Sequence, residues 1–243
     1  MHDCVPVWSI YGLRLMNEQF LARILCFSLL QNASVMPALP FLNSSLHSVE
    51  LGRSEYCPLF LLGYLLALEI ALGKPTASLI ATQKLSDAKL IANLISSKTF
   101  RPYLSNDIIG AQICGAMKNI YAIGCGIIVG KNFGENAVAS VISRSFAEMK
   151  SVGKKLDAHP ETLSGLSGLG DLFLTCSSKK SRNFSLGFDL AKGKKLENIL
   201  RSKKTIAEGA YTVRAIKKLG VKLKLSLPLN DACLLYTSPS PRD

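Results

Sequence analysis

The chain has 243 residues, with 29 Lys and Arg against 17 Asp and Glu and a formal net charge of +12. This length allows one large or two small domains, and a hydrophobic content of 48% with a positive mean hydropathy raises the question of a membrane span. Seven cysteines occur without a C-x-x-C pair and without histidines at zinc-binding spacing, so no metal site is expected. Their pattern favours a reduced, cytoplasmic setting.

The positive charge is concentrated in residues 150–224, which hold 17 of the 29 basic and 6 of the 17 acidic residues. The lysines come as scattered pairs without interleaved aromatic residues, which favours a solvated basic face over a nucleic-acid site. A nucleic-acid binder remains a rival interpretation. No membrane span is predicted, because the apolar run 59–73 is too short and the run 107–129 carries Lys118 near its middle.

In chain order, residues 1–58 show no reliable alternation of strand and helix patterns and are expected to be irregular. Residues 77–82 and 100–104 then read as short strands on either side of a helix at 87–96. A G-x-G-x-x-G/A turn after a first strand, which would hold a cofactor pyrophosphate, does not occur.

From residue 107 onward the apolar residues follow helical spacing, most clearly at 107–129, 138–149 and 206–219. Breaks between helices are predicted at four glycines, Gly130, Gly134, Gly193 and Gly220. The two prolines in 237–243 suit no helix, and this tail is excluded from the predicted fold. The sequence therefore predicts a mainly α protein.

A lysine in the apolar segment 115–119, G-A-M-K-N, is the most informative single feature. Glycines inside a helix cost about 1 kcal/mol each relative to alanine, so those of 107–129 indicate close backbone packing. An amine in such a helix is poorly solvated, which favours proton exchange near neutral pH. The alternative is a surface lysine whose stem covers apolar groups.

Three further motifs follow: G-L-G-D-L with L-T-C at 168–176, S-R-N at 181–183 and A-E-G at 207–209. In this order and spacing, over roughly residues 67–232, the motifs resemble the bacterial NAD(P)-dependent glycerol-3-phosphate dehydrogenase family. The resemblance implies NAD or NADP as cofactor and a small phosphorylated three-carbon substrate. It also implies interconversion of sn-glycerol 3-phosphate and dihydroxyacetone phosphate, a role in glycerophospholipid synthesis and a possible homo-oligomer.

The implied fold is a helical C-terminal domain of the 6-phosphogluconate-dehydrogenase-like type, preceded by a remnant of an α/β Rossmann domain. Residues 1–58 are unmatched, 59–105 would be the remnant of the dinucleotide-binding domain, 106–236 the helical substrate and catalytic domain, and 237–243 an unmatched tail. Without the pyrophosphate-binding turn, a catalytically inactive fragment that serves as a helical interaction or oligomerisation module is an alternative.

Oxidation of a secondary alcohol needs a base at the hydroxyl oxygen, and Lys118 is the candidate. The resemblance implies the same role, with Asn119 and Asp171 beside it to orient the amine and the substrate hydroxyls. A helix cap is the alternative for Asp171. Cys176 is interpreted as a small packing residue.

Ser181, Arg182 and Asn183 precede a helical run, where a hydroxyl, a guanidinium and an amide suit a phosphate. Thr175 is expected to support the same pocket. The resemblance also implies that the cofactor contacts four residues, namely Ala67, Arg182, Ile206 and Glu208. A surface salt bridge is the alternative for Glu208.

Gly63 and Ala67 match a family segment, G-P-S-F-A, in which the glycine belongs to the substrate site. Residues 64–66 depart from that segment, since Tyr64, Leu65 and Leu66 stand where the family has proline, serine and phenylalanine. The contact that the serine would make with the substrate is therefore not expected here.

Overall fold

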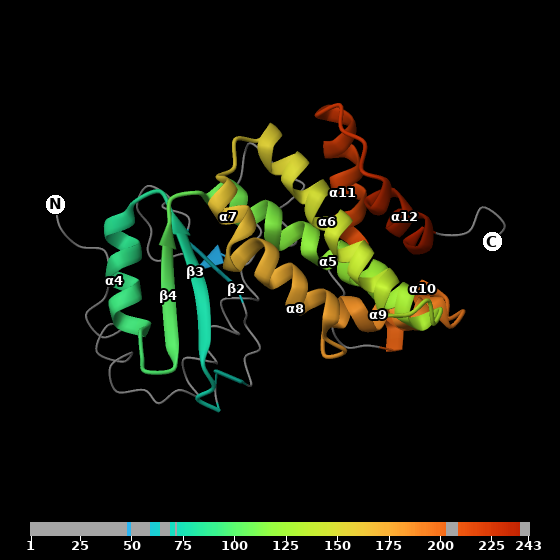
Figure 1. Ribbon diagram of the computed structural model, residues 1–243, viewed down its shortest axis with the longest axis horizontal. Helices are drawn as coiled ribbons and strands as arrows, with labels where there is room; N and C mark the ends of the chain where they lie inside the picture. The colour runs from blue at the N-terminus through green and yellow to red at the C-terminus, as the bar shows by residue number, and fades with distance from the viewer. Residues whose placement is uncertain (1–47, 50–58, 64–68, 71, 203–208, 239–243) are drawn as a thin grey trace.

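The structure is a computed structural model that describes residues 48–49, 59–63, 69–70, 72–202 and 209–238. A small α/β part stands beside a larger group of helices, and the two are joined by one long central helix (Figure 1). The mainly α architecture behind a short α/β segment is as the sequence predicts.

The α/β part holds a four-stranded sheet in the order β1-β2-β3-β4. Its elements are β1 (Ser48–Val49), β2 (Leu59–Gly63), β3 (Thr76–Thr82), α4 (Leu85–Ile95) and β4 (Phe100–Ser105). The two predicted strands and the helix between them are confirmed to within two residues at each end. The sequence did not predict β2, which pairs antiparallel with β3, because a short apolar run without alternation does not distinguish strand from helix.

The two faces of β3 pack against different partners, as side chains alternate along a strand. Ile80 belongs to a small apolar cluster with Ala88 and Ile95 of α4 and Phe100 of β4. Leu79 and Ala81, on the opposite face, belong to the main core formed with the helices. The sheet is therefore packed directly against the helical part.

The helical part begins three residues after β4. Its elements are α5 (Ile108–Gly130), α6 (Glu135–Lys155), α7 (Pro160–Ser164), the π-helical turn η1 (Leu166–Gly170), α8 (Asp171–Ser177), α9 (Arg182–Ala191), α10 (Leu196–Ser202), α11 (Gly209–Lys222) and α12 (Pro228–Thr237). The long helix predicted at 107–129 is confirmed. So are the predicted breaks at Gly130, Gly134 and Gly193, but not the one at Gly220.

Gly220 lies inside α11, which continues to Lys222. A Cβ at this position would lie 2.8 Å from Cδ1 of Leu227, so the glycine makes room for a core side chain. The left-handed residue that follows the helix is Lys224, with φ of 55°. The prediction of a break failed because a glycine that serves packing has the same local signature as one that ends a helix.

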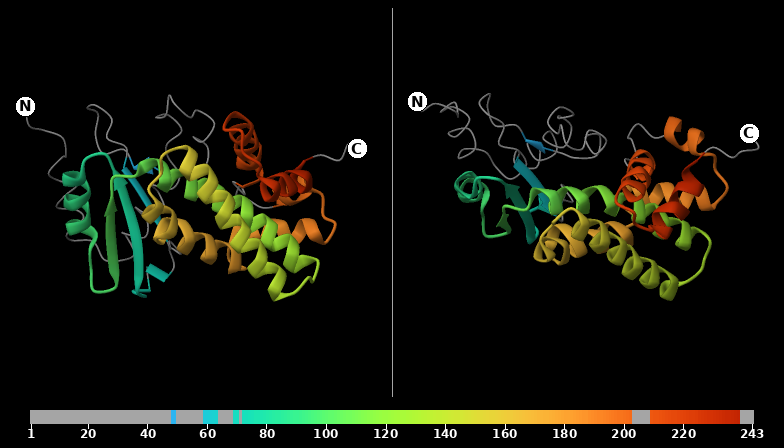
Figure 2. Two further views of the ribbon diagram at one scale, coloured as in Figure 1. Left: turned by 45° about the horizontal axis from the view of Figure 1, so that its top comes forward. Right: turned by 90° about the horizontal axis from the view of Figure 1, so that it is seen from above.

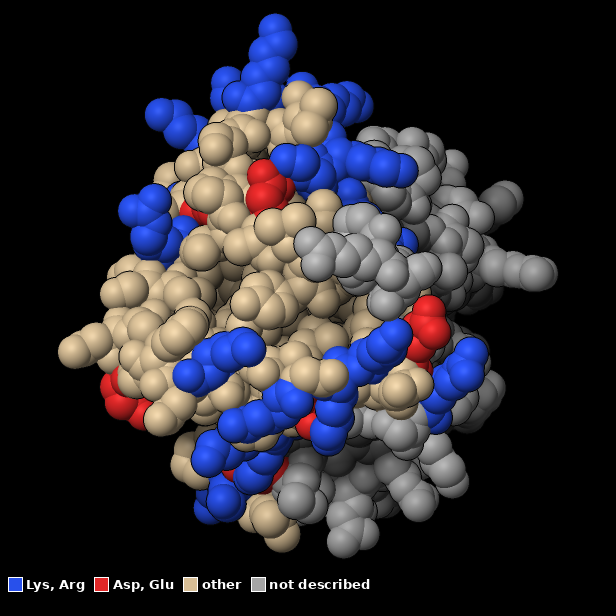
Figure 3. Space-filling model, turned by 90° about the vertical axis from the view of Figure 1, so that its right-hand side faces the viewer, with Lys and Arg blue, Asp and Glu red and all other residues tan. Residues whose placement is uncertain are grey.

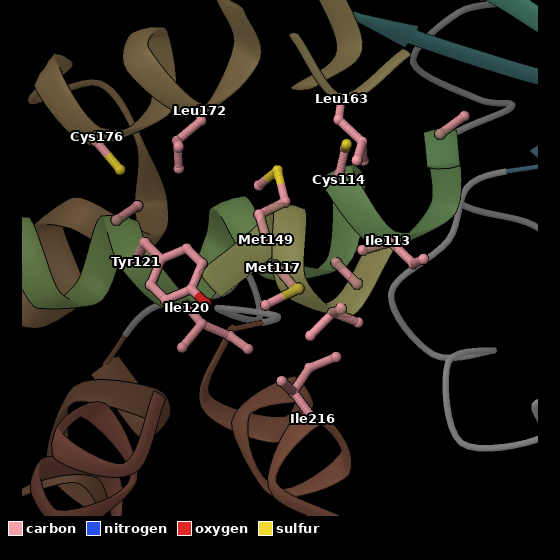
Figure 4. Packing of buried hydrophobic residues seen from close by; sticks show 14 of the residues in the cluster. Ile113, Cys114, Met117, Ile120, Tyr121, Met149, Leu163, Leu172, Cys176 and Ile216 are labelled. Carbon is pink, nitrogen blue, oxygen red and sulfur yellow. The ribbon is translucent and has the colours of Figure 1, made fainter. Parts of the chain in front are cut away.

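Helix α5 is the centre of the helical part, and α6, α8, α9, α11 and α12 pack around it (Figure 2). In the main core, Met117, Ile120 and Tyr121 of α5 lie between Leu172 and Cys176 of α8 and Ile216 of α11 (Figure 4). Among the described residues, α5 alone is long and apolar enough to cross a bilayer, but 78% of its most apolar 18-residue stretch is buried inside the protein. That burial is typical of the core helix of a globular protein.

Glycines allow the backbones of α5 and α9 to approach each other closely. The sequence predicted such close packing for the glycines of α5. A Cβ on Gly126 would overlap the backbone oxygen of Phe184, and a Cβ on Gly187 would overlap that of Ile123. Gly130 has the same function, because its Cβ would lie 2.5 Å from that of Ala191. The conformational cost of these glycines is offset by close packing of the two backbones.

The start of α12 is held by a buried carboxylate from α6. Oε1 of Glu148 accepts a hydrogen bond from the backbone N–H of Leu229 at 2.6 Å, and Oε2 accepts one from that of Asn230 at 3.3 Å. The Tyr121 hydroxyl of α5 donates to the same carboxylate at 3.0 Å. Burial raises the pKa of Glu148 above its usual 4.5, and the three donors only partly oppose this effect.

We expect the free energy of unfolding to depend on pH through Glu148. A carboxyl group with a raised folded-state pKa contributes stability that is fully present below its unfolded pKa and is lost as pH rises through the folded pKa. The wild-type chain should therefore lose stability relative to Glu148→Gln between pH 4.5 and neutrality, by about 1.4 kcal/mol per unit of pKa shift. Urea unfolding across this range measures the difference.

If the stability of the wild type and of Glu148→Gln changes with pH by the same slope, Glu148 does not contribute this pH dependence.

Candidate active site

The side chain of Lys118 in the middle of α5 forms an ion pair with Asp171, the first residue of α8. Nζ of Lys118 lies 2.5 Å from Oδ2 of Asp171, and the two side chains are 19% and 4% exposed. Lys118 is therefore not a solvated surface lysine. Its amine stays near the surface while its carboxylate partner is buried.

A π-helical turn places Asp171 opposite Lys118. The turn η1 ends directly before Asp171, and a Cβ on Gly168 would overlap the backbone oxygen of Leu163, so only glycine permits this path of the chain. Single π turns are frequent at functional sites. The alternative role of Asp171 as a helix cap is not observed, because α8 has no side-chain cap and the carboxylate meets Lys118 instead.

Thr175 lies one helical turn after Asp171 and contacts it twice. Its hydroxyl donates to the backbone oxygen of Asp171 at 2.6 Å and lies 3.4 Å from the carboxylate oxygen Oδ1. Thr175 thus supports the acidic side chain that meets Lys118. Hydrogen bonding with Cys125 and burial raise the pKa of the neighbouring Cys176 thiol well above its usual range, which suits a packing residue and not a nucleophile.

The S-R-N motif forms the start of α9. Ser181 is the N-cap, and its hydroxyl oxygen accepts a hydrogen bond from the backbone N–H of Phe184 at 3.3 Å. Arg182 is exposed, and no ion pair joins it to another described residue. Its guanidinium is therefore accessible, at a helix start that favours anions.

Asn183 has a structural partner that the sequence did not indicate. Its side chain is buried, and Oδ1 accepts a hydrogen bond from the backbone N–H of Gly209 at 3.0 Å. Gly209 in turn lies against α5, where a Cβ would approach the backbone oxygen of Asn119 to 2.6 Å. Asn183, Gly209 and Asn119, each from a different sequence motif, therefore lie next to one another.

The remaining predicted site residues are less well defined by the structure. Gly63 ends β2 and pairs with Ser78 of β3, and it is not among the described hydrogen-bond partners of Lys118 or Asp171. Ala67, Ile206 and Glu208 lie outside the described residues. Their predicted contacts with a cofactor remain predictions.

Gln112 of α5 is a buried polar residue to which the sequence assigned no role. Its side chain is 1% exposed, and neither Oε1 nor Nε2 has a hydrogen-bond partner in the part of the chain that the structure describes. A buried polar group without a partner costs about 1–3 kcal/mol. The only sequence signal was an amide in a helix that is otherwise small and apolar.

On the face of the molecule in Figure 3, Lys and Arg side chains lie in separate groups with neutral surface between them. Several lysines have acidic partners, such as Lys194 with Asp189 at 2.9 Å and Lys217 with Asp231 at 2.7 Å. This distribution is consistent with the solvated basic face predicted from the sequence.

Comparison with known proteins agrees with the motifs. The family model for the NAD-dependent glycerol-3-phosphate dehydrogenase C-terminus matches residues 107–237. A glycerol-3-phosphate dehydrogenase (NAD(P)+) from Parvibaculum lavamentivorans is 45% identical over 166 residues, which are 68% of this chain and 50% of that protein. The equivalent protein from Hyphomonas neptunium is 39% identical over 212 residues, covering 82% and 63%.

A solved structure shows the same fold. The glycerol-3-phosphate dehydrogenase from Coxiella burnetii matches with a TM-score of 0.70 and 34% identity, over 72% of this chain and 54% of that one. The chain spans about half the length of curated relatives such as the one from Parvibaculum lavamentivorans. The matched region contains Lys118, Asp171 and Arg182, and the chain therefore belongs to the NAD-dependent glycerol-3-phosphate dehydrogenase family.

Proposed function

We propose that this chain supplies the substrate-binding and catalytic part of an NAD(P)-dependent glycerol-3-phosphate dehydrogenase. The reaction is the interconversion of sn-glycerol 3-phosphate and dihydroxyacetone phosphate in the cytoplasm, in support of glycerophospholipid synthesis. The observation that carries the proposal is the ion pair of Lys118 and Asp171 in the family's motifs. We place the catalytic domain at 106–236 and part of the dinucleotide-binding domain at 59–105.

Lys118 is the proposed acid and base. In the oxidation, its neutral amine accepts the proton of the substrate C2 hydroxyl, so that the carbonyl forms as hydride leaves the carbon. In the reduction, its ammonium returns a proton to the carbonyl oxygen. The nicotinamide cofactor, when bound, accepts or supplies the hydride.

Asp171 positions the amine and balances its charge. A carboxylate 2.5 Å from Nζ holds the ammonium in one place, and Thr175 fixes that carboxylate from the next helical turn. Asn119 follows Lys118 on α5 and is the proposed partner of a substrate hydroxyl. These residues come from two elements, α5 and α8, that the core packs together.

Arg182 is the proposed phosphate-binding residue. It is exposed at the first turn of α9, where a guanidinium fork and free backbone N–H groups suit a phosphate. Ser181 supports this site as the helix cap. Asn183 acts through its bond to Gly209, which keeps the start of α9 beside Asn119.

The described residues do not supply a site for the cofactor pyrophosphate, because the sequence contains no G-x-G-x-x-G/A turn. We propose Ala67, Arg182, Ile206 and Glu208 as cofactor contacts, as the family resemblance implies.

The chain by itself should bind NADH and NADPH only weakly and show little dehydrogenase activity. Without the turn, the pyrophosphate lacks the backbone donors that would replace its water. Calorimetric titration with each nucleotide measures the affinity, and absorbance of NADH with dihydroxyacetone phosphate measures the activity. Micromolar binding together with reduction would contradict this expectation and place a pyrophosphate site in residues 1–58.

A fusion tests the proposed function directly. Residues 59–243 joined to the nucleotide-binding half of the Parvibaculum relative should reduce dihydroxyacetone phosphate with NADH or NADPH. Dihydroxyacetone without the phosphate is the control substrate and should react far more slowly. A folded fusion that binds the nucleotide but reduces neither compound would contradict the proposal.

A further inference from the structure

The carboxylate of Asp107 joins the start of α5 to the start of α7. Asp107 is 5% exposed, and as the N-cap of α5 its Oδ1 accepts a hydrogen bond from the backbone N–H of Gly110 at 2.8 Å. Its Oδ2 accepts a second hydrogen bond from the backbone N–H of His159, also at 2.8 Å. Helix capping explains only the first of these bonds, so the second oxygen has a separate role.

The segment that begins at His159 leads to Asp171 through successive backbone contacts. The backbone oxygen of His159 accepts from the N–H of Leu163 at 3.2 Å, and η1 rests on Leu163, because a Cβ on Gly168 would overlap the backbone oxygen of that leucine. The N–H of Asp171 in turn donates to the backbone oxygen of Leu166 in η1. The position of Asp171 therefore depends on where α7 begins.

Residues 159–171 are attached to one side of α5 at both of their ends. Asp107 holds the first residue, and Lys118 contacts the last through its ion pair. Eleven residues at about 100° and about 1.5 Å each place Asp107 and Lys118 about 20° apart around the helix axis and about 16 Å apart along it. Burial, followed by the charges of Asp107 and Asp171, raises the pKa of the Cys114 thiol between them to about 12. Both carboxylates therefore lie on the side of α5 that carries Lys118.

We propose that Asp107 is a positioning residue for the reaction at Lys118. By accepting the hydrogen bond of His159, it fixes α7 and η1 so that the carboxylate of Asp171 stays against the amine. This inference rests on the proposed function. Asp107 acts through Asp171, because the described partners of its own carboxylate are the N–H groups of Gly110 and His159. Misplacement of a catalytic group by about 1 Å can lower a rate by about 10²-fold, so a remote anchor of this kind affects turnover.

Asp107→Asn separates the two hydrogen bonds of Asp107. Aspartate, asparagine and serine are comparable N-caps, so the bond to Gly110 persists, but the amide has only one oxygen and loses the acceptor for His159. Asp107→Ser, with a single short hydroxyl, removes the same bond by different means. Asp157→Asn is the matched control, since Asp157 is exposed in the same loop and its φ of 56° is one that asparagine tolerates.

The reactivity of the Lys118 amine tests the contact on the chain alone. Acetylation of the folded protein with acetic anhydride, followed by mass spectrometry of its peptides, gives the rate at Lys118 relative to the exposed Lys131 at the end of α5. We expect this ratio to rise roughly threefold in Asp107→Asn and Asp107→Ser, because the amine is no longer held in its ion pair. The ratio should stay unchanged in Asp157→Asn. An unchanged ratio in both Asp107 variants would overturn the inference.

A double-mutant cycle on the fusion of residues 59–243 with the Parvibaculum nucleotide-binding half tests the role in turnover. Asp107→Asn should lower kcat about tenfold and change the Michaelis constant little, because the displaced group acts in the chemical step and not in phosphate binding. In an Asp171→Asn background, the same substitution should have no further effect on kcat. Independent sites this far apart give additive effects, so an additive loss would show that Asp107 does not act through Asp171.

The same cycle distinguishes a failure of this inference from a failure of the proposed function. If Asp171→Asn lowers kcat and Asp107→Asn either adds its full loss or has no effect in the wild-type background, only the positioning role of Asp107 is contradicted. If Asp171→Asn leaves kcat unchanged in a folded fusion, the ion pair with Lys118 is not needed for the reaction, and the proposed function itself is contradicted.

Discussion

Lys118→Ala should lower the turnover of dihydroxyacetone phosphate reduction by about 10²- to 10⁴-fold, the usual contribution of a positioned acid or base. The Michaelis constant should change much less, because the substitution leaves the proposed phosphate-binding residue Arg182 in place. The rate is best measured at saturating substrate on the fusion of residues 59–243 with the nucleotide-binding half of the Parvibaculum relative. A single-turnover experiment then separates the chemical step from product release.

The Lys118 variant needs a check of folding. Removal of the amine leaves the buried carboxylate of Asp171 without its partner, which destabilises a protein core. Circular dichroism and Tm should therefore be recorded beside the rate. Lys154→Ala, an exposed lysine at the end of α6, is the control and should keep wild-type turnover. Near-normal turnover in a folded Lys118→Ala variant would exclude the assignment.

Arg182→Lys should raise the Michaelis constant for dihydroxyacetone phosphate about tenfold or more. An ammonium is a point charge and cannot reproduce the two parallel hydrogen bonds of a guanidinium with phosphate oxygens. Arg182→Ala, which removes the charge as well, should have the larger effect. The dependence of the initial rate on substrate concentration gives this constant, and titration with inorganic phosphate gives an independent affinity.

The exposed Arg214 of α11 offers a matched substitution away from the proposed site. Arg214→Lys should leave both the Michaelis constant and phosphate affinity unchanged. If Arg182→Lys behaves like Arg214→Lys, with unchanged cofactor affinity, the phosphate must be bound elsewhere. Arg182→Lys and Arg214→Lys both keep the net charge of the chain, so a general effect of net charge cannot explain a difference between these two variants.

Much of the local structure could be read from the sequence. The strands around 77–82 and 100–104 and the long helix after residue 107 follow from apolar periodicity and are confirmed. Strand β2 could not be assigned in this way, since a run of five apolar residues fits more than one structure. Gly220 was misinterpreted because the reason for that glycine is Leu227, a residue of the next element.

Some features of the candidate site likewise follow from the sequence, and others follow only from the tertiary structure. The sequence by itself identified the candidate residues, because a lysine in a small, apolar helix and an S-R-N motif at a helix start stand out wherever they pack. The family resemblance already implied that Asp171 lies beside Lys118, and the tertiary structure shows the ion pair across 53 positions. Only the tertiary structure showed that Asn183 meets Gly209. Local patterns reflect the preferences of neighbouring residues, whereas these contacts depend on how α8, α9 and α11 pack around α5, which no short window of sequence contains.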